Sequence, residues 1–218
     1  MTRTTRIALG GFGNVGQQLA RAILSEPDCG IEIAAISACG LDAARKRAAN
    51  IGLNVPAVPA GEMPDHAKVI VECATYEGFR DILEPSIRAG CHVIAVSVGA
   101  LAVNLDLLDL AKENGATLQI GSGAMPGLDI LRSAREGAIK SVKLESHIRP
   151  GSFAHESYVI ERGIDLNLAE TEPVRVFSGS AREAAGHFPR HFNVAVGLSL
   201  AGIGLDRTEI EIFANGTL

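Results

Sequence analysis

The stretch that decides the fold is LGGFGNVGQQLARAIL, residues 9–24. Within it, residues 11–16 form a G-x-G-x-x-G sequence that follows an apolar run and opens a predicted helix. In that setting the first glycine permits a tight turn, the second lets a pyrophosphate approach the backbone, and the third lets helix and strand pack closely. The motif therefore predicts a dinucleotide cradle. The alternative is a packing turn that binds no ligand.

The first half of the chain alternates short apolar runs with helical patterns. The predicted strands are residues 6–11, 31–38, 67–75, 91–101 and 116–124, and the predicted helices are residues 14–26, 41–52, 76–90 and 104–115. This alternation is typical of a parallel sheet with helices on both faces.

The pattern changes after about residue 121. Residues 125–137 read as a helix, 138–151 as extended, 173–204 as a strand and two helices, and 208–214 as a half-buried strand. The predicted fold class is α/β, with an N-terminal Rossmann doubly wound parallel sheet and a smaller α+β domain with an open mixed sheet. We expect a dinucleotide-binding domain over 1–121 and a substrate and catalytic domain over 122–218, incomplete at its C-terminus.

Composition excludes several classes of protein. A net charge of −5 argues against a nucleic-acid partner, and the sequence contains neither a membrane-length apolar run nor a signal peptide. The four cysteines form no CxxC pair and the six histidines show no metal spacing, so we expect reduced thiols and no metal. We expect a cytoplasmic homo-oligomer that acts on a small molecule.

The segment after the second predicted strand bears on the choice of cofactor. An Asp or Glu there would hold the ribose 2′-hydroxyl of NAD, but residues 37–40 contain no acid and Asp42 comes late. Arg45 begins a run of three cations, residues 45–47. This pattern suits the 2′-phosphate of NADP, so the cofactor is NADP or NAD. The alternative for each cation is the solvated face of a helix.

Several segments resemble a known family. GGFGNVG (10–16), VIVECAT (69–75), GSGAMPGLDIL (121–131) and HFPRHFNVAVGLSLAGIGLDRT (187–208) stand in the order found in L-aspartate dehydrogenases. The resemblance covers nearly all of the chain, and the last two segments are more specific than the glycine loop. It implies NAD(P)-dependent oxidation of L-aspartate to iminoaspartate, or the reverse reductive amination from oxaloacetate and ammonia, in amino-acid metabolism and NAD biosynthesis.

The resemblance and the strand ends together define a predicted cofactor site. Ala124 and Asn193 match family positions that contact the dinucleotide, although a helix N-cap is an alternative role for Asn193. Arg149 and Arg190 are candidates for binding a dicarboxylate. The predicted cofactor-binding residues are Gly11, Phe12, Gly13, Asn14, Val15, Arg45, Cys73, Ala74, Thr75, Ser97, Ala124 and Asn193.

The catalytic residue is left unassigned. By the resemblance, the proposed general acid/base is a histidine in an Asn-x-His segment that would fall beyond Leu218. His187 and His191 are the candidates within the sequence, and His191 stands where the family commonly has Asn. Three readings stay open: a dehydrogenase whose remaining segment lies outside this sequence, a short variant that uses one of these histidines, and a non-catalytic NAD(P)-binding sensor. A homoserine-type dehydrogenase is the related enzyme alternative.

Overall fold

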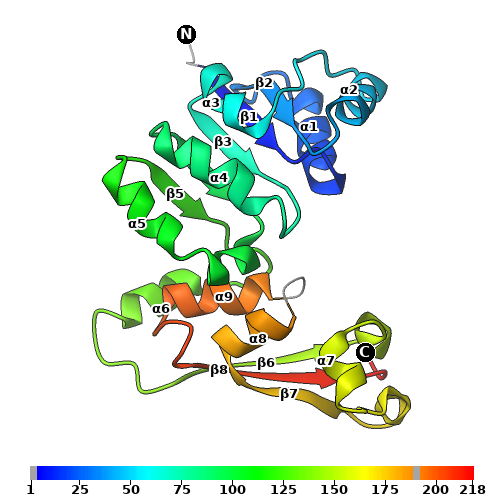
Figure 1. Cartoon of the computed structure of the whole chain (residues 1–218). Helices are drawn as coiled ribbons and strands as arrows, with labels where there is room; N and C mark the ends of the chain where they lie inside the picture. Colours follow the sequence, from blue (N-terminus) through cyan, green and yellow to red (C-terminus); the bar gives the residue numbers. More distant parts are fainter. Residues whose placement is uncertain (1–3, 189–191) are drawn as a thin grey trace. The chain divides into compact units, whose positions relative to one another are not determined.

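The computed structural model describes residues 4–188 and 192–218. The chain forms two compact units, Met1–Gly121 and Ser122–Leu218, and each unit contains its own β-sheet (Figure 1). Among the described residues, no helix is both long enough and apolar enough to cross a membrane.

The first unit contains a five-stranded parallel sheet. Its strands are β1 (Thr5–Gly10), β2 (Ile31–Ser37), β3 (Val69–Glu72), β4 (His92–Ala95) and β5 (Thr117–Ile120). They lie in the order β2-β1-β3-β4-β5, and every neighbouring pair is parallel. The direction in which strands are added reverses between β1 and β3, which is the switch point of a doubly wound sheet. The predicted Rossmann architecture is confirmed.

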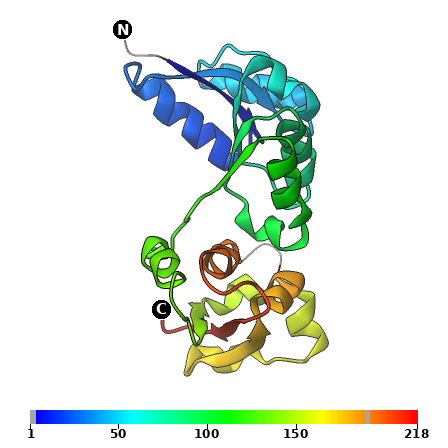
Figure 2. The same cartoon turned by 90° about the vertical axis from the view of Figure 1, so that its left-hand side faces the viewer.

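Helices cover both faces of this sheet. They are α1 (Asn14–Ser25), α2 (Leu41–Asn50), α3 (Met63–His66), α4 (Phe79–Arg88) and α5 (Asp106–Glu113), with short 3₁₀ turns at Ala60–Glu62 and Val98–Val103. Ala20 of α1 and Ala44 of α2 pack with Leu9 in one buried core. Helix α4 packs on β3 and β4, and α5 packs on β5. Figure 2 shows α1, in blue, on the opposite side of the strands from the green α5.

The fourth strand is shorter than the sequence predicts. A strand was expected over 91–101, but β4 ends at Ala95 and Val98–Val103 forms a 3₁₀ turn. The Val96 amide still donates to the Glu72 carbonyl at 3.2 Å, but it also contacts the Glu72 carboxylate at 3.1 Å, and the Ser97 amide donates to the same carboxylate at 2.9 Å. An apolar run of this kind does not reveal these bonds to a distant carboxylate.

The second unit contains a three-stranded sheet. Its strands are β6 (Val142–Ile148), β7 (Val174–Ser180) and β8 (Thr208–Ala214), and its helices are α6 (Leu128–Ala134), α7 (Ser157–Glu161), α8 (Ala181–His187) and α9 (Asn193–Ala201), with 3₁₀ turns at Pro150–Phe153 and Leu166–Glu170. Strand β8 lies in the centre, parallel to β6 and antiparallel to β7. The predicted open mixed sheet is therefore confirmed.

One face of the second sheet is packed and the other is polar. Ile210 and Ile212 of β8 are fully buried, and α8 and α9 pack on this strand (Figure 1). Between these positions, Glu211 pairs with Lys143 of β6, with the Lys Nζ 2.6 Å from the carboxylate. The alternation of apolar and charged residues follows from the two-residue period of a strand.

Candidate functional site

A cavity of about 470 Å³ lies at the carboxyl ends of β1, β2 and β3. This is the edge at which open α/β sheets bind ligands. The cavity brings together eight of the predicted cofactor-binding residues: Gly11, Phe12, Gly13, Asn14, Val15, Cys73, Ala74 and Thr75. The other residues that line it are Ser37, Ala38, Cys39, Ala60, Gly78, Asp81 and Ile82.

The three motif glycines meet different surroundings. Gly11 has φ +96°, and a Cβ there would lie 2.5 Å from the backbone nitrogen of Ala74. A Cβ at Gly16 would collide with the carbonyl of Gly11. Gly13 differs from both, because its φ is −84° and a Cβ would meet no protein atom within 4 Å. The fold thus requires Gly11 and Gly16, whereas the space beside Gly13 is open to a ligand.

Helix α1 begins at this open space. Its first intrahelical bond runs from the Gln17 amide to the Gly13 carbonyl, at 3.0 Å. The amides before Gln17 therefore have no carbonyl partner within the helix. The first turn carries no acidic side chain, so nothing there competes for the positive end of the helix dipole. This arrangement suits a pyrophosphate.

The end of β2 presents small and polar groups to the cavity. Ser37 and Cys39 line it, and no carboxylate stands at this strand end. Arg45, which was predicted to bind the cofactor, is absent from the described lining: its Nη1 lies 2.6 Å from Asp42 and its Nη2 donates to the Ala57 carbonyl. Arg47 instead donates from Nε to the Phe12 carbonyl at 3.0 Å. Arg47 is therefore the cation of this run that touches the glycine loop.

Ser97 and Glu72 are hydrogen-bonded to Ala74, one of the residues that line the cavity. The predicted residue Ser97 is not among the described lining residues, but its Oγ donates to the Ala74 carbonyl at 2.8 Å. Glu72 is fully buried at the last position of β3. Sequence reasoning missed Glu72, and the available signal was an acid within the apolar run VIVECAT. Burial raises the pKa of Glu72, while backbone hydrogen bonds act in the opposite direction.

The four cysteines are free and fall into two pairs by exposure. Cys73 and Cys91 are buried, and burial with the nearby Glu72 charge raises the pKa of Cys73 to about 12. Cys73 is therefore a thiol at neutral pH, and its low thiolate fraction speaks against a nucleophilic role. Cys29 and Cys39 are exposed, and Cys39 lines the cavity.

The predicted residues of the second unit lie near the starts of two helices. Ala124 is exposed in the turn that precedes α6. Helix α6 begins at Leu128 with Gly127 at its N-cap, three residues after the predicted start of this helix at residue 125. Phe192 holds the N-cap position of α9, and Asn193 is the first residue of that helix rather than its cap.

Two of the four candidate acid/base and carboxylate-binding residues lie among the described residues of the second unit. His187 is exposed at the end of α8, with its ring centroid 4.5 Å from that of Tyr158. Arg149 is exposed just after β6. The other two candidates, His191 and Arg190, lie outside the described residues.

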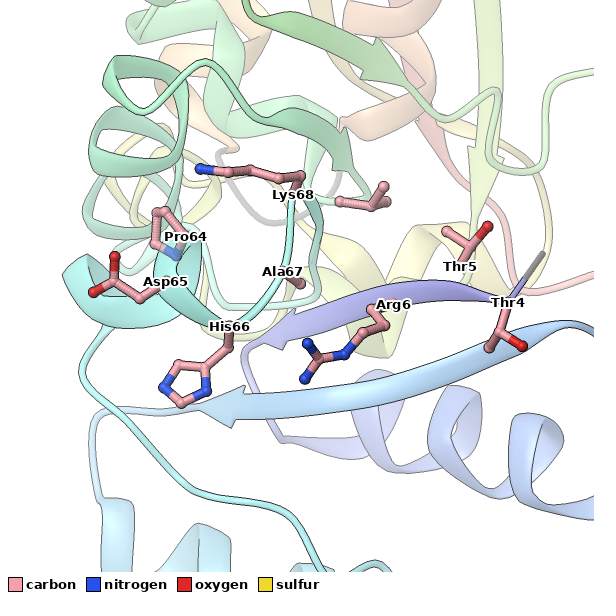
Figure 3. A pocket seen from close by; sticks show the side chains of 9 residues that line it. Thr4, Thr5, Arg6, Pro64, Asp65, His66, Ala67 and Lys68 are labelled. Atoms are coloured by element: carbon pink, nitrogen blue, oxygen red, sulfur yellow. The ribbon is translucent and has the colours of Figure 1, made fainter.

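A second hollow occupies the opposite edge of the first unit's sheet (Figure 3). Arg6, Asp65, His66 and Lys68 line it, at the amino ends of β1 and β3. The charges are of both signs, and Arg6 also pairs with Glu32 at 3.7 Å. Ligands of open α/β sheets bind at the other edge. The dinucleotide site therefore belongs to the first hollow.

Replacing Gly13 with valine tests the cradle. The variant should fold, because the added side chain meets no protein atom near the backbone, and it should lose saturable binding of NADH and NADPH. Valine at this N-cap should cost about 1 kcal/mol of stability. Gly40→Val, at the N-cap of α2, is the matched control for that cost. Unchanged affinity in a folded Gly13→Val protein would contradict the cradle. Fluorescence titration and thermal unfolding measure the two quantities.

The exposed cysteines provide a chemical footprint of the cavity. Iodoacetamide should label Cys29 and Cys39 at neutral pH and should spare the buried Cys73 and Cys91. Saturating NADPH should slow the labelling of Cys39, which lines the cavity, and leave Cys29 unchanged as an internal control. Mass spectrometry of the peptides measures both rates. If NADPH protects both cysteines equally, or protects neither of them, the result would argue against a dinucleotide in this cavity.

Two family descriptions match the chain. "Homoserine dehydrogenase, NAD binding domain" matches residues 11–120, and "Aspartate dehydrogenase, C-terminal" matches residues 129–218. Among solved structures, the aspartate dehydrogenase of Thermotoga maritima has a TM-score of 0.71 at 23% identity, covering 99% of this chain and 81% of that one. At that identity the likeness concerns the fold.

Two curated relatives are more similar in sequence. The L-aspartate dehydrogenase of Bradyrhizobium diazoefficiens is 37% identical over 98% of this chain and 75% of its own length. L-aspartate dehydrogenase 3 of Bordetella bronchiseptica is 40% identical over 96% of this chain and 76% of its own length. With a motif-bearing cavity in the first unit and family matches that span both units, the chain belongs to the aspartate dehydrogenase family.

Proposed function

We propose that this chain is an NAD(P)-dependent L-aspartate dehydrogenase, which interconverts L-aspartate and iminoaspartate. The observation that carries the proposal is the open space beside Gly13, between the start of α1 and the end of β3, in a chain of this family. The cavity residues fit a dinucleotide because the glycine loop leaves room for phosphate oxygens and the helix supplies amides that can donate to them.

The proposed reaction divides the work between the cofactor and the chain. The nicotinamide, when bound, supplies the hydride acceptor for the hydrogen on the Cα of aspartate. The chain holds the pyrophosphate at the start of α1 and places the reacting carbon by binding the substrate carboxylates. A proton must also leave the substrate ammonium group, which requires a base within hydrogen-bond reach.

We assign the two units separate roles. Residues 1–121 form the dinucleotide-binding domain and residues 122–218 the substrate domain. In the second unit, Arg149 is the described candidate for a substrate carboxylate, and Ala124 and Asn193 are candidates for contact with the nicotinamide half. His187 is the described candidate base, because it is exposed at the end of α8 and an imidazole nitrogen can accept a proton.

The cavity favours NADP over NAD. The end of β2 lacks the carboxylate that would bind a ribose 2′-hydroxyl and repel a 2′-phosphate. Arg47, which like Arg45 is not among the described lining residues, is half-buried and donates through Nε to the carbonyl of the lining residue Phe12. This leaves its two terminal nitrogens as donors for a phosphate. Arg45 is already engaged by Asp42 and the Ala57 carbonyl.

The oligomeric state and the compartment belong to the same proposal. We propose a cytoplasmic homo-oligomer. Strand β6 lies at an edge of the second sheet as described, and an edge strand can pair with another copy of the chain. The free thiols of Cys29 and Cys39 are compatible with a reducing compartment. Light scattering of the purified chain measures the oligomeric state.

Arg47→Ala tests the cofactor preference. The variant should lose affinity for NADPH by about tenfold more than for NADH, because a charge-assisted contact to the 2′-phosphate is removed. Arg45→Ala is the matched control and should leave the ratio of the two affinities unchanged. If Arg45→Ala shifts the ratio and Arg47→Ala does not, the assignment passes to Arg45. Fluorescence titration with each nucleotide gives the ratio of the two affinities for the wild type and for both variants.

The activity itself is tested with oxaloacetate, ammonia and NADPH or NADH. Oxidation of the nucleotide should depend on both oxaloacetate and ammonia, with turnover in the usual enzymatic range of about 1–1,000 per second. L-Aspartate should drive the reverse reaction, whereas L-homoserine should not. Cofactor binding without turnover would support the non-catalytic sensor instead, and turnover with homoserine would support the related dehydrogenase. The absorbance of the reduced nicotinamide measures the rate of oxidation or reduction of the nucleotide with each substrate.

A further inference from the structure

A buried carboxylate joins the ends of two neighbouring strands beneath the cavity. Glu72 is the last residue of β3 and is fully buried. Its Oε1 accepts from the Ala74 amide at 2.7 Å, and its Oε2 accepts from the amides of Val96 at 3.1 Å and Ser97 at 2.9 Å. Three donors on two oxygens is the environment of an ionised carboxylate, because a protonated acid would need an acceptor for its own proton.

These bonds fix the course of the chain where the two strands end. Ala74 belongs to the segment after β3, and Val96 and Ser97 belong to the segment after β4. A second link joins the same segments, since Ser97 Oγ donates to the Ala74 carbonyl at 2.8 Å. The Cys73 amide in turn donates to the Gly10 carbonyl at 2.6 Å, so the segment is tied to the start of the glycine loop as well.

One of the two clamped segments lines the cofactor cavity. Cys73, Ala74 and Thr75 belong to its lining, whereas Glu72, Val96 and Ser97 are not among the described lining residues. In a doubly wound sheet the adenosine ribose lies at the end of β2 and the pyrophosphate at the glycine loop after β1. The remaining half of the dinucleotide must then extend over the ends of β3 and β4, on the other side of the switch point.

We propose that Glu72 is a positioning residue for the nicotinamide half of the cofactor. It holds the backbone of Ala74–Thr75 and Val96–Ser97 in the shape that receives the nicotinamide and its ribose, without touching them. This inference rests on the proposed function only in taking NAD(P) as the ligand of the cavity.

Glu72→Gln tests the proposal with little change of side-chain shape. One oxygen becomes an NH₂ group that faces a backbone N–H, so at least one of the three bonds is lost and two donors oppose each other. The affinity for NADPH and NADH should fall by about tenfold. The affinity for ADP, which carries only the adenosine and pyrophosphate part, should change by less than about twofold.

Comparing the losses of NADPH and ADP affinity distinguishes a role in positioning the nicotinamide half from a general loss of folded structure. ADP binding is measured by displacement of NADPH fluorescence, and thermal unfolding is measured in parallel. Glu32→Gln, the same change at an exposed site on β2, is the matched control and should alter neither affinity. The proposal is overturned if Glu72→Gln binds NADPH with wild-type affinity. It is also overturned if the affinity for ADP falls as much as the affinity for NADPH.

Two further variants keep the proposal testable if Glu72→Gln does not fold. Ser97→Ala removes the hydroxyl link to Ala74 and the side-chain contact with Glu72 but keeps the backbone bond to Glu72. It should weaken NADPH binding by about two- to fivefold and leave ADP binding unchanged. Glu72→Asp keeps the charge and should recover part of the lost affinity. If Ser97→Ala leaves NADPH binding unchanged, the clamp does not position the cofactor.

Turnover distinguishes this inference from the proposed function. In an active protein that oxidises L-aspartate, Glu72→Gln should raise the KM for the oxidised nucleotide. It should leave kcat at saturating cofactor and the KM for L-aspartate close to the wild-type values. A wild type that binds NADPH but does not oxidise L-aspartate would refute the proposed function, and the binding constants would still decide the role of Glu72. A normally active wild type whose Glu72→Gln variant keeps its cofactor KM would refute the role of Glu72 alone.

Discussion

The close approach of the glycine loop to the end of β3 is the constraint on which the site depends. Gly11 adopts a left-handed conformation with no room for a Cβ beside Ala74, and Gly16 packs directly on the Gly11 carbonyl. This contact sets where α1 begins and therefore where its amides point. The cavity is the space that remains once these backbone segments have packed, and its walls come from strand ends far apart in the sequence.

Much of this arrangement is readable from the residues. The alternation of apolar runs and helical patterns predicts the five parallel strands, because both faces of such a sheet must be buried. The G-x-G-x-x-G motif and the strand end at 73–75 predict eight residues that line the cavity. These predictions succeed because they depend on local periodicity and on the rule that parallel strands end at one edge of the sheet.

The features that the sequence does not reveal depend on long-range partners. Beyond the end of β4, the amides of Val96 and Ser97 bond to the carboxylate of Glu72 on another strand, which no local pattern records. Arg45 and Arg47 stand two residues apart on α2 and therefore point about 200° apart around the helix. One meets Asp42 and Ala57, the other meets the Phe12 carbonyl, and a run of cations does not distinguish them.

The buried carboxylate also carries an energetic cost. Because burial raises the pKa of Glu72, the stability linked to this group is present at low pH and is lost as the pH rises through the raised value. Hydrogen bonds from the amides of Ala74, Val96 and Ser97 act in the opposite direction and offset part of the desolvation penalty. The hydrogen bonds that hold the ends of β3 and β4 together are thus made at the expense of stability.

The open space at Gly13 has a consequence for this balance. The chain's own side chains do not fill this cavity, so the cavity contributes few packing contacts to the folded state. A bound ligand supplies those contacts. By mass action, a cofactor at a hundredfold excess over its Kd would add about 2.7 kcal/mol to the free energy of unfolding. The abundance of the folded protein in a cell would then follow the size of the nicotinamide nucleotide pool.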